Sequence, residues 1–449
     1  MTRKRRHQVA LDTPPMDVQL TDVAFGGEAL GHLPDGRVVF VPRSLPGETA
    51  RVRLQEDRRD YARAELEALL SSAPGRVEAP CPYYHAGCGG CSWQHADYPL
   101  QLRVKHAVVV DQLRRIGHFA EPESFVRPTL GMLNPWHYRN QARFTVGRKF
   151  GELCFTFRSS HRLLRIDHCW IVHPAINEAL AQLQSKLSVV PGRVHQVSIR
   201  VGANTGQALV APALPGIGQI ETGQPWLEEE LLGARFRLRP TSFFQVNTLR
   251  ERSDLGDSSL AAGDQFEART GHRALLPVPP DGLSMAEILA LLVLDRLRPS
   301  ASDVIVDAYS GVGTFAVLLA PLVKHVIAIE EARAAVQDAR HNARHLSNVT
   351  LIEAKTEAAL PALDSVVPAL AARPTAVILD PARVGAHPAV LDALLAQRPE
   401  RLVYVSCDPT TLARDLRVLV DGGYTLTDVL PIDMFPQTYH IESVATLIR

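Results

Sequence analysis

The sequence predicts an α/β protein in which a doubly wound, Rossmann-like C-terminal domain follows a small β-barrel and a strand-rich central domain. Three observations support this fold class. Short alternating apolar runs with glycine turns occupy residues 14–72, and strand-like runs dominate residues 134–247. From residue 283 to residue 449, helical and strand-like patterns alternate, as in a parallel sheet with crossover helices. A chain of 449 residues is also too long for one ordinary core.

Composition excludes several classes of protein. Apolar residues make up 46% of the chain and charged residues 21%, which fits a soluble globular protein. No apolar run reaches the length of a membrane-spanning helix, and no hydrophobic signal core follows the basic tail at residues 1–13. We therefore expect a cytoplasmic protein with no membrane partner. The formal net charge is zero, so any affinity for nucleic acid has to come from local basic clusters.

Residues 14–72 predict a barrel of the OB type, a fold that often binds oligonucleotides. Five short alternating runs are separated by GG, PDG and PG turns. Positive charge for an RNA backbone would come from Arg37, Arg51, Arg53, Arg58 and Arg59. An ordinary solvated surface explains the same charges equally well.

The central domain, residues 73–249, begins with a cysteine cluster. The chain has six cysteines, namely Cys81, Cys88, Cys91, Cys154, Cys169 and Cys407. A cytoplasmic chain of this size does not need disulfides, and the close spacing of the first three favours a shared metal or an iron–sulfur cluster. Cys169 is the natural fourth ligand and Cys154 its competitor. Zinc is the alternative to iron–sulfur.

The rest of the central domain is rich in basic and aromatic residues. A helix is expected from Leu100 to Ile116, followed by strands. The basic residues are Arg139, Arg143, Arg148, Lys149, Arg158, Arg162 and Arg165, and the aromatic ones are Trp136, Tyr138, Phe144, Phe155 and Phe157. Phosphate contacts and base stacking are one interpretation, and a solvated face over an aromatic core is the other. Residues 250–282 are polar and poorly periodic, which predicts a flexible or partly ordered insertion.

A glycine turn between a strand and a helix marks the candidate cofactor site of the C-terminal domain, residues 283–449. The motif DAYSGVGT, at 307–314, lets the backbone approach a nucleotide-like ligand, although it lacks the full dinucleotide fingerprint. Glu330 ends the next strand, about twenty residues on, where a carboxylate can accept both ribose hydroxyls. Asp380 ends a later strand at the same carboxyl edge. This arrangement favours S-adenosylmethionine over a dinucleotide.

Cys407 and Glu442 are the most informative pair in the chain. Cys407 follows a strand-like run in SCDPTTLARD, and Glu442 lies in DMFPQTYHIESV. A thiolate can add to carbon 6 of a uracil and so activate carbon 5 for methylation, after which a base has to remove the carbon 5 proton. A single cysteine at a strand end is more often a buried structural residue. The flanking motifs favour methylation of a pyrimidine carbon.

These motifs resemble those of the RNA 5-methyluridine methyltransferase family, in particular its iron–sulfur branch, which acts on ribosomal RNA. The cysteine cluster, SFFQVN, DAYSGVGTF, DPARVG, SCDPTTLARD and DMFPQTYHIE follow the family's order over nearly the whole chain. The resemblance implies an N-terminal TRAM domain, Cys407 as the nucleophile and Glu442 as the base. It implies S-adenosylmethionine contacts from Gln245, Tyr309, Thr314, Glu330 and Asp380. It also implies a 4Fe–4S cluster held by Cys81, Cys88, Cys91 and Cys169.

The function implied by the resemblance is methylation of uridine carbon 5 in structured RNA, with 23S ribosomal RNA as the expected substrate and a monomer as the expected state. A transfer-RNA enzyme of the same chemistry is the first alternative, although that bacterial branch usually lacks both the TRAM domain and the cysteine cluster. A non-catalytic RNA-binding or assembly protein on the same fold is the second, and the intact Cys407 and Glu442 oppose it. Two departures from the family stand out, namely Ala382 in place of a proline and the long insertion at 250–282.

Overall fold

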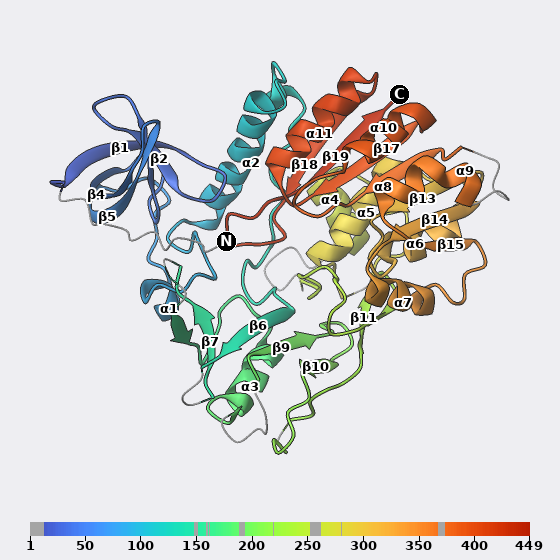
Figure 1. Cartoon of the computed structure of the whole chain (residues 1–449), viewed down its shortest axis with the longest axis horizontal. Helices are drawn as coiled ribbons and strands as arrows, with labels where there is room; N and C mark the ends of the chain where they lie inside the picture. The colour runs from blue at the N-terminus through green and yellow to red at the C-terminus, as the bar shows by residue number, and fades with distance from the viewer. Residues whose placement is uncertain are drawn as a thin grey trace, which may run out of the picture.

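The computed structural model describes most of the chain (Figure 1), namely residues 13–147, 151–158, 160, 162–187, 194–218, 220–251, 262–279, 281–366 and 373–449. The predicted basic tail lies almost wholly outside these residues, as do Arg148 and Lys149. No described helix is both long enough and apolar enough to cross a membrane.

The N-terminal segment forms the predicted barrel. Its strands are β1 (Met16–Val23), β2 (Ala29–His32), β3 (Val38–Val41), β4 (Thr49–Asp57) and β5 (Tyr61–Ser71), which close in the order β1-β2-β3-β5-β4. Alternate apolar side chains fill the interior, as the fully buried Leu20 and Val39 show. On the outside, four of the five predicted arginines pair with carboxylates of the barrel itself, namely Arg37, Arg51, Arg53 and Arg58. These pairs leave the barrel little excess positive charge.

The central region contains the cysteine segment and a five-stranded sheet. Its helices are α1 (Pro82–His85), α2 (Tyr98–Arg115), the 3₁₀ turn η1 (Pro122–Ser124) and α3 (Pro174–Leu183). The sheet order is β10-β9-β6-β7-β8, from β6 (Gln141–Val146), β7 (Leu153–Thr156), β8 (Leu163–Arg165), β9 (Gln196–Val201) and β10 (Ala208–Ala211). A hairpin of β11 (Leu227–Leu231) and β12 (Ala234–Leu238) follows. Tyr138 and Phe144 are fully buried, so these two aromatics belong to the core and not to a stacking surface.

The C-terminal sheet is doubly wound, as predicted, with strand order β15-β14-β13-β16-β17-β19-β18. Its strands are β13 (Val304–Ala308), β14 (His325–Glu330), β15 (Val349–Glu353), β16 (Ala376–Leu379), β17 (Arg401–Ser406), β18 (Thr425–Ile432) and β19 (Glu442–Ile448). The first five run parallel, and β19 pairs antiparallel with β17 and β18. Strand side chains alternate between two cores, Ile305 facing one and Val306 the other.

Helices cover both faces of this sheet. They are α4 (Ala262–Thr270), α5 (Met285–Leu297), α6 (Thr314–Leu319), α7 (Arg333–Asn342), α8 (Thr356–Ala359), α9 (Leu363–Val366), α10 (Pro388–Gln397) and α11 (Pro409–Asp421), with 3₁₀ turns η3 (Ala320–Leu322) and η4 (Leu360–Ala362). Helix α4 falls within the predicted insertion at 250–282, and its Phe266 is buried against α5. Residues 252–261 and 280 of that insertion lie outside the described residues.

Helix α2 lies between the barrel and the C-terminal sheet (Figure 1) and holds the loop that joins β18 to β19. Lys105, fully buried, donates from Nζ to Asp433 Oδ1 at 2.6 Å and to the carbonyls of Phe435 at 3.1 Å and His440 at 2.8 Å. One turn earlier, Gln101 and Gln437 exchange two hydrogen bonds of 2.9 Å. Because this loop, residues 433–441, leads directly into Glu442, α2 sets the entry into β19.

We predict that Lys105→Met lowers the free energy of unfolding by about 3–5 kcal/mol, because it leaves the buried Asp433 carboxylate without its cation. The same substitution at the exposed Lys324 serves as the control and should change the free energy by less than about 0.5 kcal/mol. Urea unfolding followed by circular dichroism measures both. Equal losses in the two variants would contradict a stabilising role for the buried pair.

Candidate active site

The seven cofactor and catalytic residues predicted from the sequence all line one cleft of about 810 Å³ at the carboxyl edge of the parallel strands. They are Gln245, Tyr309, Thr314, Glu330, Asp380, Cys407 and Glu442. Gln245 comes from the segment between β12 and α4, Tyr309 from the turn after β13, Thr314 from the start of α6, and the others from strand ends. Ligands bind at this edge in doubly wound folds, because strand ends and helix N-termini meet there.

The turn after β13 is shaped to approach a ligand. Tyr309, Gly311 and Gly313 all have positive φ, and Gly313 forms the N-cap of α6. The Glu330 carboxylate holds this turn, accepting from Gly311 N at 2.9 Å and from Ala332 N at 2.7 Å. Each of its oxygens keeps a further lone pair for a ligand hydroxyl. A tight turn closed by a carboxylate therefore lines one end of the cleft.

Cys407 directly follows β17, and Glu442 begins the neighbouring strand β19. Ser406, the last residue of β17, pairs with Ser443 of β19 in antiparallel register. One step further, that register places Cys407 across from Glu442. Cys407 is fixed from its other side as well, because Asp408 is the N-cap of α11 and accepts from Thr410 N and Thr411 N.

The electrostatics of the pair are those of a buried acidic site. Burial, then the charges of Glu442 and Asp380, raise the pKa of Cys407 to about 11. Burial and Asp380 raise the pKa of Glu442 well above its usual value, while Arg383 opposes that shift. Burial raises the pKa of Asp380 to about 7. Several buried carboxyl groups therefore share one cleft, an arrangement that disfavours further negative charge and favours a cation.

Asp307 extends this acidic cluster beneath the turn. It is fully buried, and burial followed by the charge of Asp380 raises its pKa to about 8. Its Oδ2 accepts from Ala316 N at 3.0 Å, whereas its Oδ1 has no hydrogen-bond partner within the described ranges.

Two further cleft residues, Arg383 and His440, are not among the seven predicted site residues. Arg383, after β16, lies beside Cys407 and Glu442 and partly offsets the effect of the carboxylates on both pKa values. His440 contacts Arg383, with Nδ1 3.4 Å from Nη2, and burial lowers the pKa of His440 to about 4. The DPARVG motif could have identified Arg383, since it follows Asp380 by three residues.

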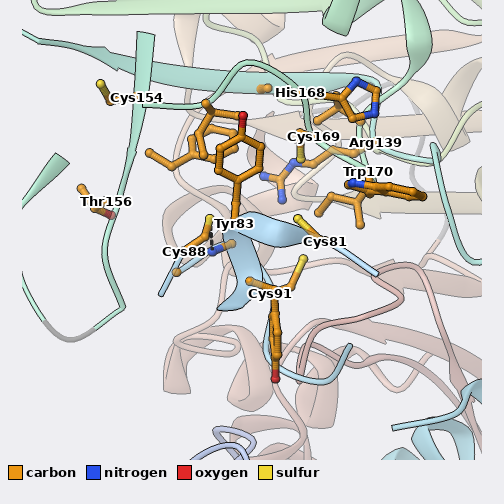
Figure 2. A pocket seen from close by; sticks show the side chains of 18 of the residues that line it. Cys81, Tyr83, Cys88, Cys91, Arg139, Cys154, Thr156, His168, Cys169 and Trp170 are labelled. Atoms are coloured by element: carbon orange, nitrogen blue, oxygen red, sulfur yellow. Dashed lines mark hydrogen bonds between the residues drawn. The ribbon is translucent and has the colours of Figure 1, made fainter. Parts of the chain in front are cut away.

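The cysteine segment forms a second cavity, of about 370 Å³. Figure 2 shows four cysteines gathered around one part of it and Cys154 set apart on β7. The four are Cys81 at the N-cap of α1, Cys88 and Cys91 on the following loop, and Cys169 before α3. Burial and the neighbouring Cys169 raise the pKa of Cys91 to about 12. The pKa of Cys154 is also raised, by burial and then by the charge of Glu152, which is no cysteine.

Three histidines near the cysteines in sequence could also bind a metal, namely His85, His95 and His168. Two of them are hydrogen-bonded to other groups, and the third is exposed. His85 bonds Ala79 O at 2.8 Å, and the buried His95 bonds the Tyr84 hydroxyl at 2.6 Å. His168 is exposed. Within the described part of the chain, no group of three or more Cys, His, Asp or Glu side chains has the spacing of a metal site. The four thiols thus line one cavity, but they are not spaced as the ligands of a bound metal ion would be.

Two family models match the chain, one near each end. A family model described as TRAM domain matches residues 16–66, and one described as tRNA (Uracil-5-)-methyltransferase matches residues 284–449. A Gloeobacter violaceus protein described as an uncharacterized RNA methyltransferase is 34% identical, with 96% of each chain covered. A Halalkalibacterium halodurans protein with the same description is also 34% identical, again over 96% of each chain.

Among solved structures, that of Pyrococcus abyssi tRNA (uracil-54, C5)-methyltransferase in complex with S-adenosyl-L-homocysteine is similar. Its TM-score is 0.66 at 22% identity, and the match covers 96% of this chain and all of that one. The similarity confirms the predicted order of an N-terminal barrel and a C-terminal doubly wound sheet.

We predict that alkylation of Cys407 by iodoacetamide in the ligand-free protein has a pH midpoint near 11, because burial and two carboxylates disfavour the thiolate. Glu442→Gln should lower the midpoint by removing a negative charge, and Arg383→Gln should raise it. Mass spectrometry of the Cys407 peptide measures the rate, with the Cys154 peptide as the internal control. A midpoint near the ordinary thiol value of about 8.5 would show that the cleft does not perturb this group.

Proposed function

The chain belongs to the RNA (uracil-5-)-methyltransferase family, and from that membership we propose that it transfers a methyl group from S-adenosylmethionine to carbon 5 of a uridine in 23S ribosomal RNA. The observation that supports this reaction is the position of Cys407 opposite Glu442, in the cleft that also contains the candidate cofactor residues. A thiol nucleophile and a carboxylate base are the two groups that methylation of a uracil carbon requires.

In this proposal, S-adenosylmethionine is contacted by Gln245, Tyr309, Thr314, Glu330 and Asp380. The glycine turn lets S-adenosylmethionine lie close to the backbone. Glu330 accepts hydrogen bonds from the ribose hydroxyls of that ligand. The buried carboxyl groups suit a sulfonium, because a cation relieves their mutual repulsion. The donor supplies the methyl group and one positive charge.

The chemistry at the base has three steps. The Cys407 thiolate, with Arg383 as its nearby cation, adds to carbon 6 of the uracil and turns carbon 5 into a carbanion. Carbon 5 then takes the methyl group, which leaves a saturated ring with a carbon–sulfur bond. Finally Glu442 removes the carbon 5 proton, the bond from Sγ to carbon 6 breaks, and the double bond returns. Because Cys407 is partly buried, the target base has to leave its stack to reach it.

Ribosomal RNA is the preferred substrate because the chain combines the TRAM barrel with the cysteine cluster. Transfer RNA is the second candidate, since the matching family model and the Pyrococcus abyssi enzyme are both described as acting on it. The two substrates imply the same catalytic residues.

We further propose that Cys81, Cys88, Cys91 and Cys169 hold a 4Fe–4S cluster. Four thiols on one cavity match the ligand set of such a cluster. Arg158 donates to the carbonyl of Cys91, which places a cation beside a site that would carry excess negative charge. A bound cluster would supply cross-links between the loop at 88–91 and the segment before α3. Its role in this proposal is structural, and no electron transfer is assigned to it.

The division of labour between the catalytic residues makes opposite predictions for two variants. Cys407→Ala should abolish transfer and form no covalent product, because no adduct with carbon 6 can arise. Glu442→Gln should still methylate but stall before elimination, so turnover falls by roughly 10²–10⁴ while a methylated protein–RNA adduct accumulates. Denaturing gels with radiolabelled donor measure both. Normal turnover of Glu442→Gln would assign the proton transfer to another group.

The substrates for this test are ribosomal and transfer RNA purified separately from a strain that lacks the gene. Label in 23S ribosomal RNA alone is expected, and label in transfer RNA alone would reverse the choice of substrate. Transfer to neither RNA would favour a non-catalytic RNA-binding protein.

For the cysteine site we predict about four iron and four sulfide per chain in anaerobically purified protein. Cys169→Ser should lose the cluster, and Cys154→Ser, the matched control on the same cavity, should keep it. Elemental analysis and the visible absorption spectrum measure the outcome. One zinc per chain in protein made with iron available would establish the alternative metal.

A further inference from the structure

Two tryptophans, Trp136 and Trp170, form a pair, and Trp170 lines the cysteine cavity. Trp170 is 36% exposed and Trp136 is half-buried. Their ring centroids are 6.1 Å apart with an interplanar angle of 69°, and the exposed His168 ring lies 6.0 Å from Trp170. In Figure 2, His168, Trp170 and Arg139 group at one side of the cavity, away from Cys154. The Trp170 indole and the Arg139 side chain therefore line the same cavity.

The backbone holds this pair rigidly. His137 N donates to Trp170 O at 3.1 Å, Arg139 N to Ile171 O at 2.8 Å, and His173 N to Arg139 O at 2.9 Å. His137, between Trp136 and Tyr138 in sequence, has a left-handed φ of 57°. Two strand-like segments are thus bonded side by side, so the indoles are presented with little entropy left to lose on binding.

Arg139 connects the tryptophan pair to the active site. Together with Arg143 it lines both the cysteine cavity and the cleft that contains Cys407 and Glu442. A strand of RNA whose target base enters the cleft therefore passes these two guanidinium groups, which suit its phosphates. The surface next to Arg139 is where an adjacent nucleotide would lie.

We propose that the tryptophan pair binds an unstacked base of the RNA next to the target uridine, with Arg139 on the phosphate between them. The proposal rests on the proposed function only in that its ligand is RNA. Removing the target from its stack leaves a neighbouring base without its partner, and an indole replaces that partner. Stacking on aromatic side chains tolerates any base, because every base has a π face.

The pair could instead shield the cysteine site, since Trp170 follows Cys169 directly and lines the same cavity. The two roles make different demands on residue 170. If Trp170 shields the cysteine site, a bulky side chain is required and its loss destabilises that site. If Trp170 stacks on a base, an aromatic ring is required and its loss weakens RNA binding. Iron content and RNA binding, measured on the same variants, therefore separate them.

The test compares Trp170→Ala, Trp170→Phe and Trp226→Ala with the wild type in the full, iron-loaded chain. Trp226 is the matched control, since it is 47% exposed, lies next to β11 and has the Arg237 guanidinium 5.2 Å from its ring centroid. The probe is a fluorescently labelled single-stranded 12-nucleotide oligouridylate (the length is about that of a typical single-strand site). Its affinity is measured by anisotropy and its contact with indole by tryptophan quenching.

We expect Trp170→Ala to weaken binding of this probe by roughly 5- to 100-fold, Trp170→Phe to restore most of it, and Trp226→Ala to leave it unchanged. Tryptophan emission of the wild type should be quenched by the probe, and Trp170→Ala should lose most of that quenching. Unchanged affinity in Trp170→Ala overturns the proposal, as does loss of iron with unaltered quenching, which would establish the shield.

The outcomes also distinguish this proposal from the proposed function. Wild-type protein that methylates ribosomal RNA but shows no quenching refutes the stacking role and leaves the methyltransferase assignment intact. Quenching that is lost in Trp170→Ala, in a protein that transfers no methyl group, supports the stacking role and refutes the assigned reaction.

Discussion

The buried ion pair between Lys105 and Asp433 is the interaction on which the geometry of the active site depends. Both side chains are fully buried, and the same ammonium also binds two carbonyls of the loop that precedes Glu442. A buried charge pair contributes little net stability compared with apolar side chains of similar volume, but it is costly to break. It therefore specifies one position of the loop. The reciprocal amide bonds of Gln101 and Gln437 fix the same loop one turn away.

The second constraint is electrostatic. Asp380 and Glu442 line the cleft and Asp307 lies buried beneath it, and burial raises the pKa of each. Such a cluster is destabilising in the empty protein and becomes favourable when a cation enters. A cleft of this kind also keeps the Cys407 thiol protonated until the local field changes, since burial and two carboxylates raise its pKa. Arg383 alone does not offset them. A cationic ligand and a reactive thiol are therefore coupled through the same few charges.

Much of this arrangement follows from local sequence. The five barrel strands and the turn after β13 were predicted because each depends on a short pattern of alternation or glycine placement. Glu330, Asp380 and Cys407 could be placed in one cleft because strand ends at one edge of a parallel sheet converge. Gln245, Tyr309 and Thr314 were named from the family resemblance alone. Lys105 could not be predicted, since a lysine in a helix ordinarily faces water and its partner is 328 positions away along the chain. Tyr138 and Phe144 were ambiguous for a related reason, because alternation does not say which face of a strand is covered.

The loop at 433–441 is also hydrogen-bonded to the cysteine segment. Gln437 O accepts from Ser92 N at 2.8 Å and from Trp93 N at 3.0 Å, directly after Cys91. Tyr138, just before Arg139, donates from its hydroxyl to Pro436 O at 3.0 Å. One loop is therefore held by α2, by the cysteine segment and by the strand segment that carries the tryptophan pair. Because its far end is Glu442, a shift in any of these supports moves the carboxylate relative to Cys407. The central region thus contributes to the position of a carboxylate that belongs to the C-terminal sheet.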